Sequence, residues 1–97
     1  MASTADVSGR AIITVLGSDR PGIVAAVASI LAQHAVNILD ISQTILQGIF
    51  TMTMLVDLES AKVEFSVLQA QLDELSHTLD VQITMQREEV FRYMYRL

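Results

Sequence analysis

The chain of 97 residues has no cysteine, one proline and four glycines. Without cysteine there can be no disulfide, no thiolate metal site, no cysteine nucleophile and no redox motif. A small domain that is stable without disulfides fits a reducing compartment, so we expect a cytoplasmic protein. The length suits a single domain, and a hydrophobic content of 52% excludes a disordered chain.

Basic residues are also scarce. Six lysines and arginines stand against eleven acidic residues, which gives a formal net charge of −5. Proteins that bind nucleic acids usually carry a basic stripe, and those that bind RNA on a sheet present aromatic side chains there. The sequence therefore predicts no nucleic-acid partner.

Two long stretches carry no charge, 21–39 and 41–56. The first approaches the length of a membrane span, but Gln33 and His34 interrupt it, and it opens with a proline and a glycine. Buried core elements are the better interpretation, so we expect no membrane partner. Residues 1–9 are small and polar, without a targeting signal, and we expect a mobile tail before a domain at 10–97.

The hydrophobic periodicity predicts four strands and three helices. The first half contains a strand at 10–16 and a helix that is capped by Ser18 or Asp19, has Pro21 in its first turn and ends near His34. Two strands follow, at 37–47 and 49–58, joined by a turn at Gly48. The second half contains a helix opened by Ser60 with an apolar stripe from Phe65 to Leu79, a strand at 81–86 and a helix at 88–97. Gln43 falls on the apolar face of its strand, which suggests a bulge or a contact with a partner there.

This order of elements, βαββαβ with a short C-terminal helix, predicts the α+β ferredoxin-like sandwich. Four antiparallel strands would be covered on one face by two helices. The other face would carry Ile12, Thr14 and Leu16 or their alternates, and a partly apolar face is a candidate interface.

Few side chains suggest catalysis or metal binding. His34 and His77 lie near predicted helix ends, where a histidine interacts with carbonyl groups, and no cluster has metal-ligand spacing. The acid pairs 73–74 and 88–89 are adjacent on helices, so each pair diverges toward a solvated face. No serine stands near a base motif. We expect neither a metal nor a cofactor.

The segment 17–23 carries more information, because a strand ends, the chain turns, and a helix begins. Backbone N–H groups at a helix start can hold an anion, and Pro21 has none, so Gly22, Ile23 and Val24 would donate. A well-made turn without a ligand remains the alternative.

The stretch ITVLGSDRPGIVAAVASILAQHAVNILDISQTI resembles the opening half of an ACT domain. The later FTMTMLV and VFRYMYRL resemble the free-standing, single-domain bacterial members of that family, which are related to the regulators of glycine cleavage. The resemblance covers about residues 10–97. The motif Asp-Arg-Pro-Gly alone is weak, and its spacing to Val-Asn-Ile across a helix makes it more specific.

The resemblance implies a regulatory module that is not an enzyme. Such domains pair side by side and hold amino acids between protomers. Matching positions predict the ligand-binding residues Asp19, Pro21, Gly22, Ile23, Asn37 and Ile38. Serine-binding members carry a polar side chain where this chain has Gly17, which leaves the amino acid open. The side chain of Asn37 could instead cap a turn.

Three functions stay open from the sequence. The leading one is a homodimer, or a larger homo-oligomer, that senses a small amino acid and signals to a regulatory partner. A second is an assembly module without a ligand. A third is a small phosphate-handling hydrolase that uses Arg20 in the loop after the first strand.

Overall fold

The computed structural model describes residues 9–94, which form four strands and three helices. The elements are β1 (Arg10–Ser18), α2 (Ile23–Gln33), β2 (Asn37–Leu46), β3 (Ile49–Asp57), α3 (Phe65–Leu79), β4 (Gln82–Arg87) and α4 (Glu88–Met94). The predicted order of elements is confirmed. The predicted tail, apart from Gly9, and the last residues of the predicted terminal helix lie outside the described residues.

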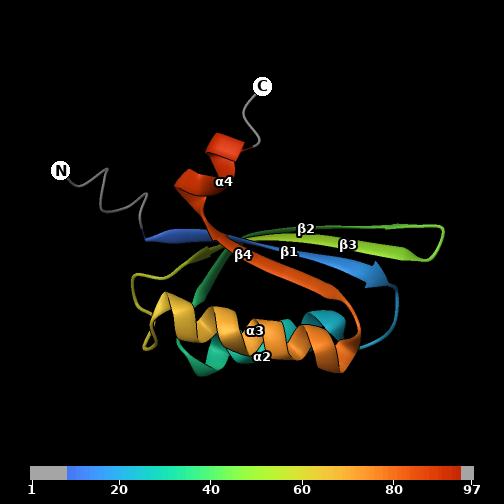
Figure 1. The fold of residues 1–97 in the computed structure, drawn as a ribbon, viewed down its shortest axis with the longest axis horizontal. Coiled ribbons are helices and arrows are strands. Elements are labelled where there is room, and N and C mark those ends of the chain that lie inside the picture. Colours follow the sequence, from blue (N-terminus) through green and yellow to red (C-terminus); the bar gives the residue numbers. More distant parts are fainter. Residues whose placement is uncertain (1–8, 95–97) are drawn as a thin grey trace.

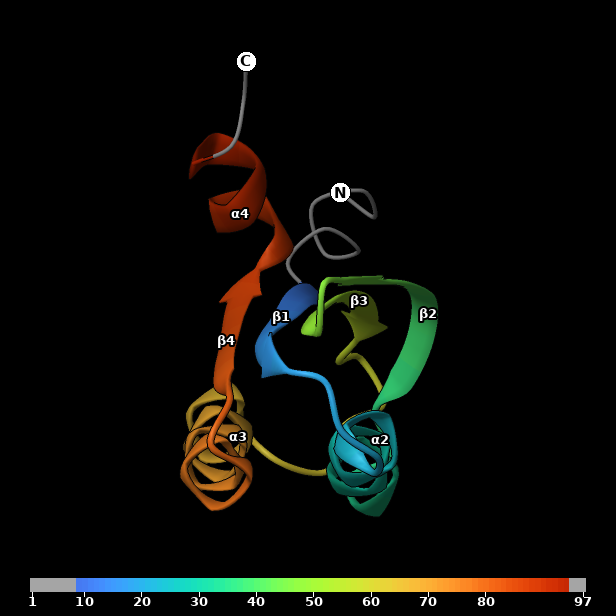
Figure 2. The same cartoon turned by 90° about the vertical axis from the view of Figure 1, so that its right-hand side faces the viewer.

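The four strands form one sheet in the order β2-β3-β1-β4, and all neighbours are antiparallel. Figure 1 shows α2 and α3 side by side along one face of the sheet. Seen end-on in Figure 2, α2 lies below the half formed by β2 and β3, α3 lies below β4, and α4 extends on the opposite side of the sheet. This is the predicted ferredoxin-like sandwich, with β2 and β4 as its two edges.

The core lies between the sheet and the two helices. Alternate residues of β1 and β3 face the helices, as the period of two predicts. The buried set includes Ala11, Ile13 and Val15 of β1, Phe50, Met52, Met54 and Val56 of β3, Ile23, Val27 and Leu31 of α2, Leu68 and Leu72 of α3, and Ile83 and Met85 of β4. Three of the chain's methionines, Met52, Met54 and Met85, thus fill core positions, where this flexible side chain packs well.

The other face of the sheet is lined with hydroxyl groups. Ser42, Thr53, Thr14 and Thr84 lie in register across the four strands, and the hydroxyls of Thr14 and Thr84 form a hydrogen bond. Leu16 stands on the same face and is 46% exposed. The face is therefore partly apolar, as predicted.

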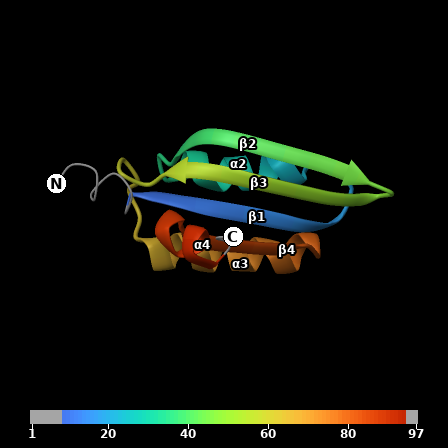
Figure 3. The same ribbon diagram turned by 90° about the horizontal axis from the view of Figure 1, so that it is seen from above.

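A tight turn joins β2 and β3 (Figure 3). Gln47 and Gly48 have φ angles of 52° and 80°, the left-handed values that a two-residue type I′ hairpin turn requires. The turn predicted at Gly48 is confirmed.

The predicted bulge at Gln43 is wrong, because Gln43 pairs regularly with Met52. The irregularity instead lies at Leu39, since Ile38 pairs with Val56 while Asp40 pairs with Leu55. The extra residue lets Ile38 pack against the core. The Asp40 carboxylate accepts a hydrogen bond of 2.8 Å from the Ile41 N–H at this place.

The two helix starts also differ from the prediction. Residue Ser60 does not open α3, which begins at Phe65 after the N-cap residue Glu64. The segment before α3 is held by long-range contacts, including a 2.9 Å hydrogen bond from the Lys62 N–H to the His34 carbonyl. The N-cap of α2 is Gly22 rather than Ser18 or Asp19, and no side chain caps this helix.

Of the helices within residues 9–94, none combines the length and the apolar character that crossing a bilayer requires.

Candidate functional site

The turn between β1 and α2 carries four of the six predicted ligand-binding residues. Asp19, Pro21 and Gly22 are exposed, whereas the side chain of Ile23 is only 2% exposed and packs into the core. Ile23 can therefore offer a ligand its backbone N–H but not its side chain. The first hydrogen bond of α2 runs from the Ala26 N–H to the Gly22 carbonyl over 2.9 Å, so the N–H groups before Ala26 have no partner within the helix.

Two hydrogen bonds hold this turn. The Asp19 N–H donates to the Gly48 carbonyl over 2.8 Å, which joins the turn to the β2–β3 hairpin. The guanidinium group of Arg20 donates to the Leu79 carbonyl at the end of α3. The side chain of Arg20 thus serves to fix the turn, which weakens its candidacy as a phosphate-binding group.

Two glycines shape the turn for different reasons. Gly22 has a φ of 93°, which L side chains rarely adopt, and nothing lies within 4 Å of where its Cβ would be. Gly17 lies against Val81, the residue before β4, where a Cβ would stand 2.6 Å from Cγ1 of Val81. A side chain at position 17 would therefore collide with Val81.

The other two predicted residues lie at the far end of the sheet. Asn37 pairs with Asp57 at one end of β3, whereas Leu46 and Ser18 pair with Ile49 at the other end. At about 3.3 Å per residue, the two ends of β3 are roughly 26 Å apart. A single chain does not bring Asn37 and Ile38 together with the turn.

Strand β2 is an edge strand with an apolar surface. Most of its side chains are exposed, and the large hydrophobic ones on the strand and its hairpin are Leu39, Ile41, Ile45, Leu46 and Ile49, with Leu46 67% exposed. A long edge strand of this kind has free backbone hydrogen-bonding groups on one side and readily pairs with another strand. The exposed edge of β2 therefore runs from Asn37 at one end of the sheet to the β2–β3 hairpin at the other end.

The two histidines have partners. His77 Nδ1 lies 2.9 Å from the Asp73 carbonyl, the type of contact predicted for a helix end. His34 Nε2 instead lies 2.7 Å from Oε1 of Gln71, so it joins α2 to α3 through a side chain. Within residues 9–94, the structure contains no group of three acidic, histidine or cysteine side chains that could hold a metal ion.

The prediction that both acids at 88–89 face solvent is wrong for Glu88. Its side chain is 1% exposed and accepts two hydrogen bonds from Arg10, of 2.7 and 2.8 Å, and two from Arg92, of 2.9 and 2.7 Å. The hydrogen bonds from Arg10 are the main cause that lowers the pKa of Glu88; burial opposes them, and Arg92 adds to them. Sequence spacing could reveal the pair with Arg92, four residues on, but only the fold brings Arg10 there.

Comparison with known proteins shows relatives of the same size. The family model of the ACT domain matches residues 10–86. The UPF0237 protein MJ1558 of Methanocaldococcus jannaschii is 47% identical over 88 residues, which are 91% of this chain and 98% of that protein.

Two solved structures extend the comparison. An ACT domain protein from Streptococcus pneumoniae is 42% identical, with a TM-score of 0.74 over 89% of this chain and 97% of the other. A protein described as a glycine cleavage system transcriptional repressor is 29% identical, with a TM-score of 0.70 over 80% of this chain and 44% of that one.

Proposed function

Because the chain belongs to the ACT domain family, we propose that it is a non-catalytic regulatory module that binds a small amino acid between the protomers of a homodimer. Domains of this family are typically regulatory and bind amino acids. In this proposal the module acts in the cytoplasm and passes the binding signal to a partner protein.

The exposed edge of β2 is the observation that carries the proposal. Two copies can pair antiparallel along this edge about a two-fold axis, which joins their sheets into one. If the axis lies at Ile41, so that Ile41 faces its own copy, Asn37 of one protomer comes close to Ile45 and Leu46 of its partner. Leu46 adjoins the hairpin that the Asp19 N–H contacts, so this pairing brings together the two ends that one chain keeps apart.

The resulting boundary offers complementary groups to an amino acid. The N–H groups of Gly22 and Ile23 would receive the carboxylate, because a helix start favours negative charge. The Asn37 amide of the partner subunit would receive the ammonium group, with the Asp19 carboxylate as a second acceptor. Gly22 leaves open space above the backbone, so a ligand can approach closely.

The amino acid itself remains to be identified by experiment. Glycine deserves the first titration, since one structural relative is described as a regulator of glycine cleavage. Gly17 offers no side chain to a ligand, and Val81 leaves no space for one at this position.

Calorimetric titration with each proteinogenic amino acid tests the proposal. At least one should bind to the wild-type dimer, and Asn37→Ala should weaken it about ten- to hundredfold, because a hydrogen bond to a charged group contributes about 1.5–3 kcal/mol. The free energy of unfolding should fall by only about 1 kcal/mol, since Asn37 is exposed.

Gln33→Ala is the matched control, because it removes another exposed amide, at the end of α2. It should leave the affinity unchanged. A large loss of stability in Asn37→Ala with unchanged affinity would exclude Asn37 as a ligand contact.

An assembly module without a ligand is the second candidate, and the apolar β2 edge also favours it. A dimer that binds none of the amino acids would support this alternative. The hydrolase is less well supported, because Arg20 is engaged with the Leu79 carbonyl; an assay of acyl-phosphate hydrolysis tests it directly.

A further inference from the structure

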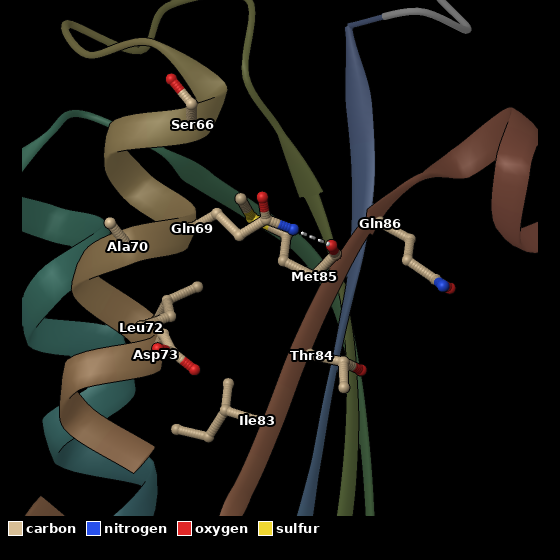
Figure 4. A pocket seen from close by; sticks show the side chains of 9 residues that line it. All are labelled: Ser66, Gln69, Ala70, Leu72, Asp73, Ile83, Thr84, Met85 and Gln86. Atoms are coloured by element: carbon tan, nitrogen blue, oxygen red, sulfur yellow. Dashed lines mark hydrogen bonds between the residues drawn. The ribbon is translucent and has the colours of Figure 1, made fainter. Parts of the chain in front are cut away.

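A groove follows the second edge of the sheet, which β4 forms, opposite the exposed edge of β2. It consists of two adjoining hollows of about 550 and 590 Å³ that share Asp73, Ile83 and Thr84. Figure 4 shows α3 as one wall and β4 as the other. None of the six predicted ligand-binding residues lines it.

The α3 wall is a stripe of mostly short, polar side chains along the whole helix. It consists of Ser66, Gln69, Ala70, Asp73, Ser76 and His77. This spacing places all of them on one face of the helix. Its mostly polar character makes this the side of α3 that faces away from the core and borders open space.

The β4 wall offers backbone groups. In an antiparallel edge strand, the N–H and C=O groups of alternate residues point away from the sheet. The Met85 carbonyl points this way, because it accepts a 3.0 Å hydrogen bond from Nε2 of Gln69 across the groove. By the same alternation, the peptide groups of Ile83 point into the groove as well.

Gln69 shows what kind of group fits there. Its side-chain carboxamide has the same chemistry as a peptide bond, and it donates to Met85 as the N–H of an additional strand would. Gln69 is otherwise exposed, so an incoming strand can displace it into solvent. The groove thus already holds an amide in the place that a fifth strand would use.

The negative charge of the groove indicates which side chains the incoming strand should carry. Asp73 and Asp80 line it, and the carbonyl end of α3, which is the negative end of a helix, lies beside Asp80. Among the described residues that line the two hollows, there is no lysine or arginine. At the groove's ends, Arg20 contacts the Leu79 carbonyl and Arg87 stacks over Phe65.

We propose that this groove binds an extended segment of a partner protein, which adds to β4 as a fifth strand and places a lysine or arginine beside Asp73. Backbone hydrogen bonds give such strand addition its affinity, and alternate side chains give it specificity. A second copy of this chain fits less well, because it would bring its own Asp73 and Asp80 carboxylates to the same edge. The proposal does not depend on the amino-acid site.

Selection from a displayed library of random peptides of about eight residues, a common strand length, tests the proposal. Enriched peptides should contain a basic residue, bind as synthetic peptides with micromolar affinity, and shift the amide resonances of Ile83 and Met85. Ala70→Arg, which fills the groove, and Asp73→Asn, which removes its central charge, should each weaken binding at least about tenfold.

Two variants on the other flank of α3 are matched controls. Thr78→Arg adds the same side chain as Ala70→Arg, and Glu74→Gln removes one negative charge as Asp73→Asn does; both positions border a different hollow, between α2 and α3. Both controls should bind the peptides like the wild type, and so should Asn37→Ala.

Several results would overturn the proposal. One is a library without any micromolar binder, and another is binding that survives Ala70→Arg. A third is a change in oligomeric mass caused by Ala70→Arg alone, which would assign the groove to a second copy of this chain.

Discussion

Glu88 shows how a single carboxylate can fix the position of a helix. It lies at the start of α4, and its partner Arg10 lies at the start of β1, so the pair joins the beginning and the end of the domain. The second partner, Arg92, belongs to α4 itself. Because Arg10 and Arg92 are 35% and 70% exposed, they can return to solvent if the carboxylate is lost.

Glu88→Gln should therefore lower the free energy of unfolding near neutral pH by about 1.5–3 kcal/mol, the usual contribution of a hydrogen bond to a charged group. The hydrogen bonds with Arg10 lower the pKa of Glu88 below 4.5 in the folded state. Its stabilising effect is then complete above pH 4.5 and is lost as the pH falls through the lowered pKa. The difference between wild type and Glu88→Gln should narrow in that acidic range.

Urea unfolding at a series of pH values measures this difference. Glu89→Gln serves as the control, since Glu89 is the exposed neighbour and its loss should have little effect. An equal destabilisation by Glu88→Gln at neutral and at strongly acidic pH would contradict the role given to the ion pairs.

At the scale of the element, β2 is the strand on which the proposed dimer depends. Its alternation is shifted by the bulge at Leu39, so Ile41 and Ile45 share the side of the sheet that carries Met54 and Phe50. They remain exposed because β2 lies at the edge. A second β2 would cover them.

Ile41→Lys should convert the proposed dimer to a monomer of 10.7 kDa. The substitution places two ammonium groups near the two-fold axis, where like charges directly opposite each other repel. Light scattering at micromolar concentration measures the mass. Val67→Lys is the matched control, because Val67 is 44% exposed on α3 and Ile41 is 41% exposed.

The control should remain a dimer. If the wild type is itself a monomer at this concentration, or if Ile41→Lys remains a dimer, then the pairing of β2 edges is wrong, and the proposed site between protomers is wrong with it.

At the scale of the whole molecule, sequence patterns correctly predicted those features that depend only on residues close together in the chain. The alternation from Phe50 to Val56 and the turn at Gly48 need only neighbours in the chain, and both are correct. The start of α3 could not be predicted, because Lys62 is held by His34 from another element. The partner of Glu88 is 78 residues away and gives no sequence signal.

The candidate site likewise has features that the sequence could predict and one that only the fold determines. Turn chemistry and family resemblance were enough to name Gly22 and Asn37. Their separation follows from the sheet order, in which β2 begins at the end of β3 opposite the hairpin. The groove beside β4 could not be predicted from the sequence. Its wall is formed by backbone groups of an edge strand, and side-chain composition does not reveal which strand lies at an edge.

The methionines of the core can report when the core opens, because an oxidant reaches them only then. Met52, Met54 and Met85 are 0%, 0% and 3% exposed, so peroxide can reach their sulfur atoms only when the sheet and helices separate. Oxidation makes the thioether polar, and a sulfoxide does not fit an apolar core. Each oxidised molecule is thus prevented from closing again.

Peptide mapping by mass spectrometry after peroxide treatment should find these three methionines oxidised far more slowly than free methionine, and faster as urea is added. Oxidation as fast as that of free methionine in native buffer would show a core that is open to solvent. In a cell under oxidative stress, the rate at which this protein is lost would then depend on the fraction of time its core is open as well as on the oxidant concentration.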